Sequence, residues 1–149
     1  MTNKAPKNAS KSISQKTNTK GKAVAKKPVK SKLIKKLDVV FSEYIRKKDS
    51  ANGKAKCVTC GKVDEWKKMQ AGHFMSRTKY ATRWDEENVQ VQCVRCNRFS
   101  QGEQYLFSLY LGADKAKELY DKSLTSWSQS IEQLQKTIEH YVSLNKKME

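Results

Sequence analysis

Two Cys-x-x-Cys pairs constrain the fold of this chain more than any other feature of its sequence. They read Cys57-Val-Thr-Cys60 and Cys93-Val-Arg-Cys96. Each pair can place two sulfur atoms on one tight turn, and two such turns complete the tetrahedral shell that Zn²⁺ prefers. Four sulfurs leave no position for water on the metal, so we expect one structural zinc.

Disulfide formation and redox chemistry are the alternative uses of these cysteines. The N-terminus has no apolar segment typical of a secretory signal, and no apolar run is long enough to span a membrane. We therefore expect an intracellular protein, in which thiols stay reduced and metal binding is the favoured use of paired cysteines.

The charge of the chain indicates its partner. Lysine and arginine number 31 against 15 acidic residues, which gives a formal net charge of +16 in 149 residues. Such an excess favours a polyanion, above all nucleic acid. Solubility is the alternative use of a basic surface. A membrane is a weaker candidate, since no lipidation signal or basic amphipathic anchor is present.

Residues 1–32 differ in composition from the rest. They hold ten lysines, and no acidic residue precedes Asp38. A segment with so little apolar surface cannot offset its ordering entropy, so we expect a disordered arm that either neutralises phosphates or is a solvated tail. The length of the remainder, residues 33–149, fits one domain.

Periodicity predicts mainly helices in that domain. Apolar residues at steps of three and four begin at Leu33 and predict a helix that ends before Asn52-Gly53. Residues 62–92 are a mixed stretch in which the segment 88–92 alternates like a strand, and we expect helices after Asn97. Ser126 and Gln129 form a plausible capping box for the last helix.

His73 lies between the two cysteine pairs, in a stretch, residues 61–92, longer than the roughly 15 to 20 residues of a simple zinc ribbon. A zinc with four sulfurs does not need His73 as a ligand. A zinc deaminase would have His-x-Glu, but Phe74 and Met75 follow here. A packing residue and a catalytic base remain as interpretations.

The motifs around His73 resemble those of HNH endonucleases, and more closely those of the NinG (Rap) family of lambdoid phage recombination endonucleases. The likeness covers residues 36–111. It is carried by Leu37-Asp38, Phe41-Ser42-x-Tyr44-Ile45-Arg46, Cys57-Val-Thr-Cys60-Gly61, Gln70-Ala-Gly-His73-Phe74, Ser76-Arg77, Ala81-Thr82-Arg83, Glu87-Asn88-Val89 and Gln92-Cys93-Val-Arg-Cys96-Asn97.

This resemblance implies an α+β fold with a ββα-metal core, tied by the zinc and framed by N- and C-terminal helices. His73 would lie on the first strand as the general base, a role that suits an imidazole. Asn88 would orient its ring. Asn97, near the start of the following helix, would be one oxygen ligand of a catalytic Mg²⁺ or Mn²⁺.

The sequence departs from the common HNH pattern at Gly72, where many members carry a carboxylate or a second histidine. Gln70, Asp85 and Glu86 are candidates for the missing metal ligand. His73 as a metal ligand instead of the base is also open.

We predict phosphate contacts for Arg77, Lys79, Arg83, Arg95 and Arg98, because Arg suits bidentate phosphate binding. The resemblance implies cleavage of branched, Holliday-junction-like DNA during phage recombination, in the cytoplasm of the bacterial host. Two matched cuts suggest a homodimer, and phage or host recombination proteins are further partners. The alternatives are a non-catalytic zinc module that binds nucleic acid and an HNH nickase for linear duplex.

Overall fold

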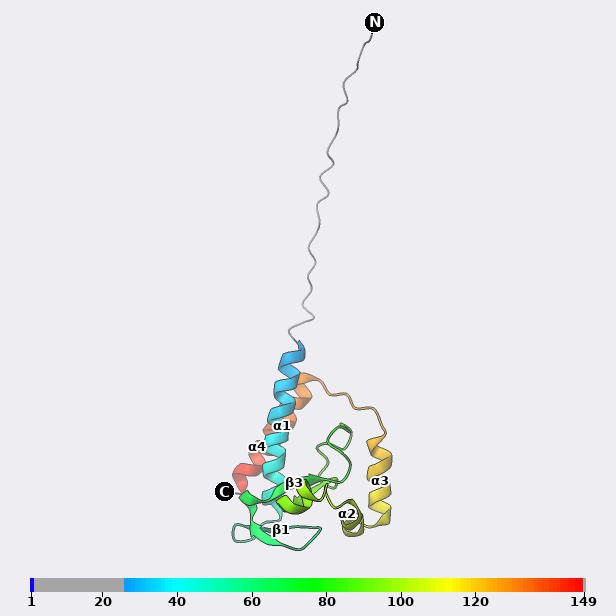
Figure 1. The fold of residues 1–149 in the computed structure, drawn as a ribbon. Helices are drawn as coiled ribbons and strands as arrows, with labels where there is room; N and C mark the ends of the chain where they lie inside the picture. The colour runs from blue at the N-terminus through cyan, green and yellow to red at the C-terminus, as the bar shows by residue number, and fades with distance from the viewer. Residues whose placement is uncertain (2–25, 149) are drawn as a thin grey trace.

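The structure is a computed structural model, and it describes Met1 and residues 26–148 (Figure 1). The predicted arm lies largely outside the described residues. The elements in chain order are α1 (Lys26–Lys48), β1 (Lys54–Lys56), β2 (Val63–Glu65), the 3-10 turn η1 (Trp66–Lys68), β3 (Gln70–His73), β4 (Val89–Gln92), the π-helix η2 (Arg95–Phe99), α2 (Gln104–Leu111), α3 (Ala113–Ser123) and α4 (Ile131–Lys147).

Helix α1 begins at Lys26, so the predicted start at Leu33 was wrong. Lysine is a good helix former, and Pro28 lies in the first turn, where its missing N–H costs no helical hydrogen bond. Tertiary contacts also extend the helix. The Lys30 amine donates to the Gln129 carbonyl at 2.7 Å and lies 5.4 Å from the centroid of the Trp127 ring.

The strands of the described residues form two short antiparallel pairs. Strands β1 and β2 pair Lys54 with Glu65, and β3 and β4 pair Gln70 with Gln92 and His73 with Val89. The mixed α+β class is confirmed. The element after β4 is a π-helix of five residues, with α2 following it, so the predicted helix at Asn97 is a single short turn.

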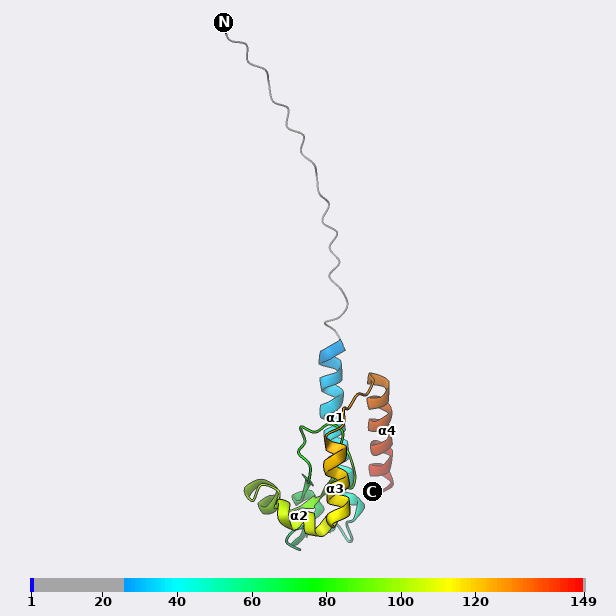
Figure 2. The ribbon, with the colours of Figure 1, turned by 90° about the vertical axis from the view of Figure 1, so that its right-hand side faces the viewer.

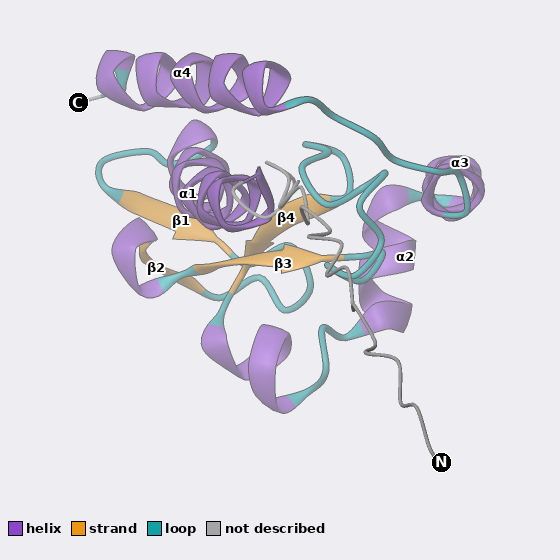
Figure 3. Ribbon diagram, turned by 90° about the horizontal axis from the view of Figure 1, so that it is seen from above, coloured by secondary structure: helices purple, strands orange, loops and turns teal. Residues whose placement is uncertain are grey.

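The elements form layers, with α1 lying between the β3–β4 pair and α4 (Figure 3). Helices α1 and α4 run parallel, side by side (Figures 1 and 2). The Tyr141 ring of α4 packs against Phe41 and Tyr44 of α1, and the Asn145 amide donates to the Val40 carbonyl. No helix within the described residues is long and apolar enough to cross a membrane.

The capping box of α4 is formed by Ser130 and Gln133, not by Ser126 and Gln129. The Ser-x-x-Gln pattern occurs twice, four residues apart. The first copy is excluded from the helix because Trp127 packs in the linker between α3 and α4. Its ring centroid lies 4.9 Å from that of Tyr80 and 5.4 Å from that of Trp84.

Candidate functional site

The four cysteines form one cluster, as their spacing predicted. Their sulfur atoms all lie within 4.8 Å of one another, and those of Cys60 and Cys93 are 3.7 Å apart. Zinc–sulfur bonds of roughly 2.3 Å require sulfurs about 3.8 Å apart in a tetrahedron. The cluster therefore fits a structural zinc.

Backbone hydrogen bonds shape the two turns of the cluster. Gly61 adopts a left-handed conformation (φ 75°), which lets its N–H donate to the Cys57 carbonyl. The Val58 N–H donates to the Val91 carbonyl at 2.9 Å and fastens the first turn to β4. The Asn97 N–H donates to the Cys93 carbonyl, which makes the second turn continuous with η2.

The thiols differ in their readiness to ionise. Burial raises the pKa of Cys96 to about 12. Burial acts in the same direction on Cys57, but hydrogen bonds from the Thr59 hydroxyl and nearby amides outweigh it and lower that pKa to about 6. Zinc binds cysteine as the thiolate, so a bound zinc would favour the ionised form of its sulfur ligands.

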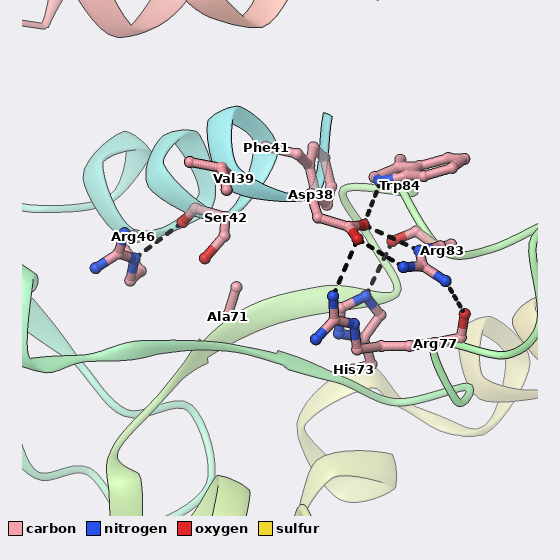
Figure 4. Close-up of a pocket in the computed structure, with 10 residues that line it drawn as sticks. All are labelled: Asp38, Val39, Phe41, Ser42, Arg46, Ala71, His73, Arg77, Arg83 and Trp84. Atoms are coloured by element: carbon pink, nitrogen blue, oxygen red, sulfur yellow. Dashed lines mark hydrogen bonds and ion pairs between the residues drawn. The ribbon is translucent and has the colours of Figure 1, made fainter. Parts of the chain in front are cut away.

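His73 lies in a hollow of about 290 Å³ between α1, β3 and the loop that follows β3 (Figure 4). The charged groups around it are Asp38, Arg46, Arg77 and Arg83. Three guanidinium groups against one carboxylate give the hollow a net positive charge. Such a hollow can hold an anion, and phosphate is the anion that arginine binds in bidentate fashion.

The surroundings of His73 fix its tautomer. Its Nε2 lies 3.0 Å from the Arg83 carbonyl oxygen, which can only accept a hydrogen bond, so Nε2 carries the proton. Nδ1 then has a lone pair available for a proton. Burial, with minor repulsion from Arg77 and Arg83, lowers the pKa of His73 to about 4, although its bond to the Arg83 carbonyl acts in the opposite direction. The imidazole is consequently neutral at physiological pH.

Asp38 of α1 is the functional residue that sequence reasoning missed. Its Oδ1 accepts from Arg83 Nε and Trp84 Nε1, both at 2.9 Å. Its Oδ2 accepts from Arg83 Nη2 at 2.6 Å and from Arg77 Nη2 at 3.1 Å. One carboxylate thus anchors the loop after β3 to α1 and holds two guanidinium groups beside His73 (Figure 4).

Replacing Asp38 with alanine is expected to destabilise the fold by about 3 kcal/mol, because breaking a buried ion pair leaves its partner uncompensated. The Arg83 side chain is only 14% exposed and the Asp38 side chain 16%. Burial alone would raise the pKa of Asp38, but the hydrogen bonds from Arg83 and Trp84 hold it below its usual value. Their stabilising effect is present above about pH 4 and is lost as the pH falls further. Urea unfolding at several pH values measures both effects.

The matched control is Asp64→Ala, which removes a surface pair with Lys62. Surface pairs contribute about 0 to 1 kcal/mol, so this variant should unfold close to the wild-type midpoint. Equal losses in the two variants would contradict the anchoring role of Asp38.

Asn88 does not orient the His73 ring, and that prediction was wrong. Its amide nitrogen donates to the carbonyls of Met75 and Thr82, and its Oδ1 accepts from the Met75 N–H at 2.6 Å. The side chain is fully buried. Asn88 therefore closes the loop after β3, and the Arg83 carbonyl of that loop orients His73.

The departure at Gly72 has a steric cause. A Cβ atom at this position would lie 2.0 Å from Oε1 of Gln92, a residue of the neighbouring strand β4. Gln92 is fully buried and donates to the Gly102 carbonyl at 2.7 Å. A carboxylate before His73 would have to displace this side chain.

Asn97 lies in a second hollow, of about 590 Å³, next to that of His73. The two hollows share Ser42, Arg46, Ala71 and Arg77. Lys67, Lys68 and Arg98 also line the second one, and none of the described residues that line it is acidic. We call it the basic groove. The Asn97 amide donates to Gln70 Oε1 at 2.7 Å there.

The residues predicted to contact phosphates lie partly in the basic groove and partly elsewhere on the protein. Arg77 and Arg98 line the basic groove. Lys79 lies in a hollow near Trp127, and Arg95 lies beside Cys60 and Cys93.

The two acidic candidates for the missing metal ligand are engaged elsewhere. Asp85 pairs with Lys122 at 2.6 Å. Glu86 accepts from the hydroxyls of Tyr44 and Tyr141.

Comparison with known proteins agrees with the motifs. The family model described as Bacteriophage Lambda NinG protein matches residues 1–149. A search of curated proteins and a search of solved structures gave no match. Since the family model spans the whole chain, the protein belongs to the NinG family.

Proposed function

We propose that the protein is a DNA endonuclease of the HNH type, with His73 as its general base. The observation that carries the proposal is the placement of His73: its Nε2 lies against the Arg83 carbonyl, and it lines a positively charged hollow that continues into a basic groove. Hydrolysis of a phosphodiester needs a base that is unprotonated near neutral pH, and the lowered pKa of His73 keeps its imidazole in that form.

In this mechanism a phosphate of the DNA backbone enters the His73 hollow. Arg77 is the guanidinium best able to follow it, because its side chain is 59% exposed and a single hydrogen bond joins it to Asp38. Arg83 stays with Asp38 and keeps its carbonyl on Nε2 of His73. Nδ1 takes a proton from water, and the resulting hydroxide forms a bond to phosphorus while the bond from phosphorus to one sugar oxygen breaks. The leaving sugar oxygen takes up a proton from solvent, so the products are a phosphate monoester end and a hydroxyl end.

A catalytic Mg²⁺ or Mn²⁺ belongs to the proposal through the family resemblance, and the described residues fit it only in part. Both oxygens of Asp38 are taken by four donors. The amide oxygen of Asn97 would be one ligand, Gln70 lines the same groove, and substrate phosphate and water would complete the shell, as is common for Mg²⁺. When bound, the cation would stabilise charge on the phosphate and the leaving oxygen.

The basic groove predicts how binding depends on salt. Replacing Lys67 or Arg98 with alanine should reduce the slope of log Kd against log salt concentration by about 1 each, because each contact releases about one counterion. Fluorescence anisotropy with labelled duplex at several salt concentrations measures the slope.

Lys136→Ala is the matched control for these groove variants. Lys136 is exposed on α4, where it pairs with Glu132 outside the groove. Its slope should equal that of the wild type. If all three variants keep the wild-type slope, the groove is not the DNA track.

Membership in the lambda NinG family suggests a role in phage recombination, and branched DNA is the substrate we propose. Cleavage of a four-way junction, a three-way branch and a linear duplex of equal length, with Mg²⁺ or Mn²⁺, tests this choice. We expect the branched substrates to be cut faster. Equal rates would favour a nickase for linear duplex, and binding without any cutting would favour a non-catalytic module.

A further inference from the structure

Helix α1 connects three hollows along one face. Residues four apart in a helix lie on the same face, and Ile34, Asp38, Ser42 and Arg46 have this spacing. Ser42 and Arg46 line the basic groove, Asp38 lines the His73 hollow, and Ile34 lines a third hollow of about 460 Å³. At 1.5 Å per residue, the stripe from Ile34 to Arg46 is about 18 Å long.

The third hollow is bounded by aromatic rings, and we call it the aromatic hollow. Tyr80 and Trp127 line it, with ring centroids 4.9 Å apart and planes inclined by 33°. Trp84, which lines the His73 hollow, lies 5.9 Å from Tyr80 and 5.4 Å from Trp127. A continuous set of three rings therefore joins the two hollows.

Cations surround these rings. The Arg83 guanidinium lies 5.0 Å from the Tyr80 centroid, and the Lys30 amine lies 5.4 Å from that of Trp127. Lys79 lines the aromatic hollow, and none of the described residues that line it is acidic. Tyr80 is 37% exposed and Leu124 is 61% exposed, so apolar surface is open to a ligand.

We propose that the aromatic hollow binds an unpaired nucleobase of the DNA strand whose backbone passes His73. A flat aromatic ligand attached to phosphates matches both the rings and the cations, whereas a purely apolar ligand would not need the cations. The volume lies within the range of small-molecule sites. The proposal rests on the proposed function for the identity of the polyanion, and it assigns unpaired bases as a feature of the substrate.

The test compares two DNA ligands of equal length and charge. One is a labelled thymidine oligonucleotide, and the other is the same backbone with abasic residues. Binding is measured by anisotropy at low salt, without a divalent cation. The wild-type protein should bind the base-containing strand about 5- to 150-fold more tightly, the range that stacking of one base supports.

Substitutions at Tyr80 locate the preference. Tyr80→Leu should bring the ratio of the two affinities close to one and leave the affinity for the abasic strand unchanged. Tyr80→Phe keeps the ring and should keep the preference. Tyr120→Leu is the matched control, since Tyr120 is an exposed tyrosine of α3 that does not line the aromatic hollow. Zinc content and thermal unfolding show that each variant is folded.

A wild-type ratio near one, or an unchanged ratio in Tyr80→Leu, would overturn the proposal. Tighter binding of the ribonucleotide version of the strand would overturn DNA as the source of the base. Cleavage is scored separately. If the protein prefers the base-containing strand but does not cleave DNA, the endonuclease proposal is refuted and the nucleobase site stands. If it cleaves DNA without that preference, the nucleobase site is refuted and the endonuclease proposal stands.

Discussion

Loss of the zinc is expected to unfold the β-strand half of the domain. Structural zinc contributes about 10 to 16 kcal/mol in zinc-finger peptides, which is comparable to the whole stability of a typical domain. Here the metal would hold the loop after β1 against β4 and η2, elements that the chain joins only through residues 61–92. Both the His73 strand and the basic groove depend on that junction.

Thermal unfolding measured by circular dichroism, with and without a chelator, checks this prediction, together with zinc analysis of the purified protein. We expect one zinc per chain, a transition that chelation abolishes or strongly lowers, and recovery when zinc is added back. Cys96→Ser should behave like the chelated protein.

Val58→Ala is the matched control for the cysteine variant. Val58 belongs to the same turn as Cys57 and Cys60, but it contributes only its backbone N–H to the bond with Val91. This variant should retain one zinc and a cooperative transition. A chelated protein that unfolds at the wild-type temperature would contradict a structural role for the metal.

The second large effect is expected from His73→Ala, which should reduce the cleavage rate by about 10²- to 10⁴-fold, the contribution of general acid–base catalysis. DNA affinity should stay close to that of the wild type, because the groove cations are unchanged. His73→Gln is the sharper variant. Its amide can still donate to the Arg83 carbonyl, but it has no basic nitrogen, so it should lose activity to a similar extent. Single-turnover cleavage of a labelled junction measures both rates.

The dependence of the cleavage rate on pH distinguishes a catalytic role of His73 from a purely structural one. The pKa of His73 is lowered to about 4, so the base remains deprotonated, and the rate should not fall through His73 protonation between pH 8 and pH 5. Between about pH 6.5 and pH 4, His73 is protonated in the unfolded chain but not in the folded one. The free energy of unfolding should therefore decrease as the pH falls through that interval.

His140→Ala is the control for the His73 variants, since His140 lies on α4 beside Tyr141. Its cleavage rate should match that of the wild type. A His73→Ala protein that cuts at the wild-type rate would exclude His73 as the base.

Local patterns in the sequence were sufficient to predict the four-cysteine cluster and the strand β4 that precedes its second pair. The two Cys-x-x-Cys turns form through short-range backbone bonds such as that of Gly61 to Cys57, so their spacing determines their geometry. The sequence of strand 89–92 alternates between Val and Gln, although all four residues are buried. These features depend on few distant contacts.

The role of Asp38 could not be predicted in the same way. It lies on a helix whose periodicity describes only the apolar face, and its main partner, Arg83, is 45 residues away. The Asn88 amide lies closer in sequence to its partners, but which backbone groups it reaches depends on how the loop folds. The capping box was misplaced because two identical patterns compete and only the packing of Trp127 decides between them.

The most direct test of the account is one reaction in which binding and cutting are measured on the same molecules. Wild-type protein in excess over a labelled four-way junction is incubated with and without Mg²⁺, and the bound and cleaved fractions are recorded together. The account predicts binding in both cases and cleavage with Mg²⁺. A junction that is fully bound yet remains intact with Mg²⁺, and equally with Mn²⁺, would contradict it and leave a zinc-stabilised DNA-binding module.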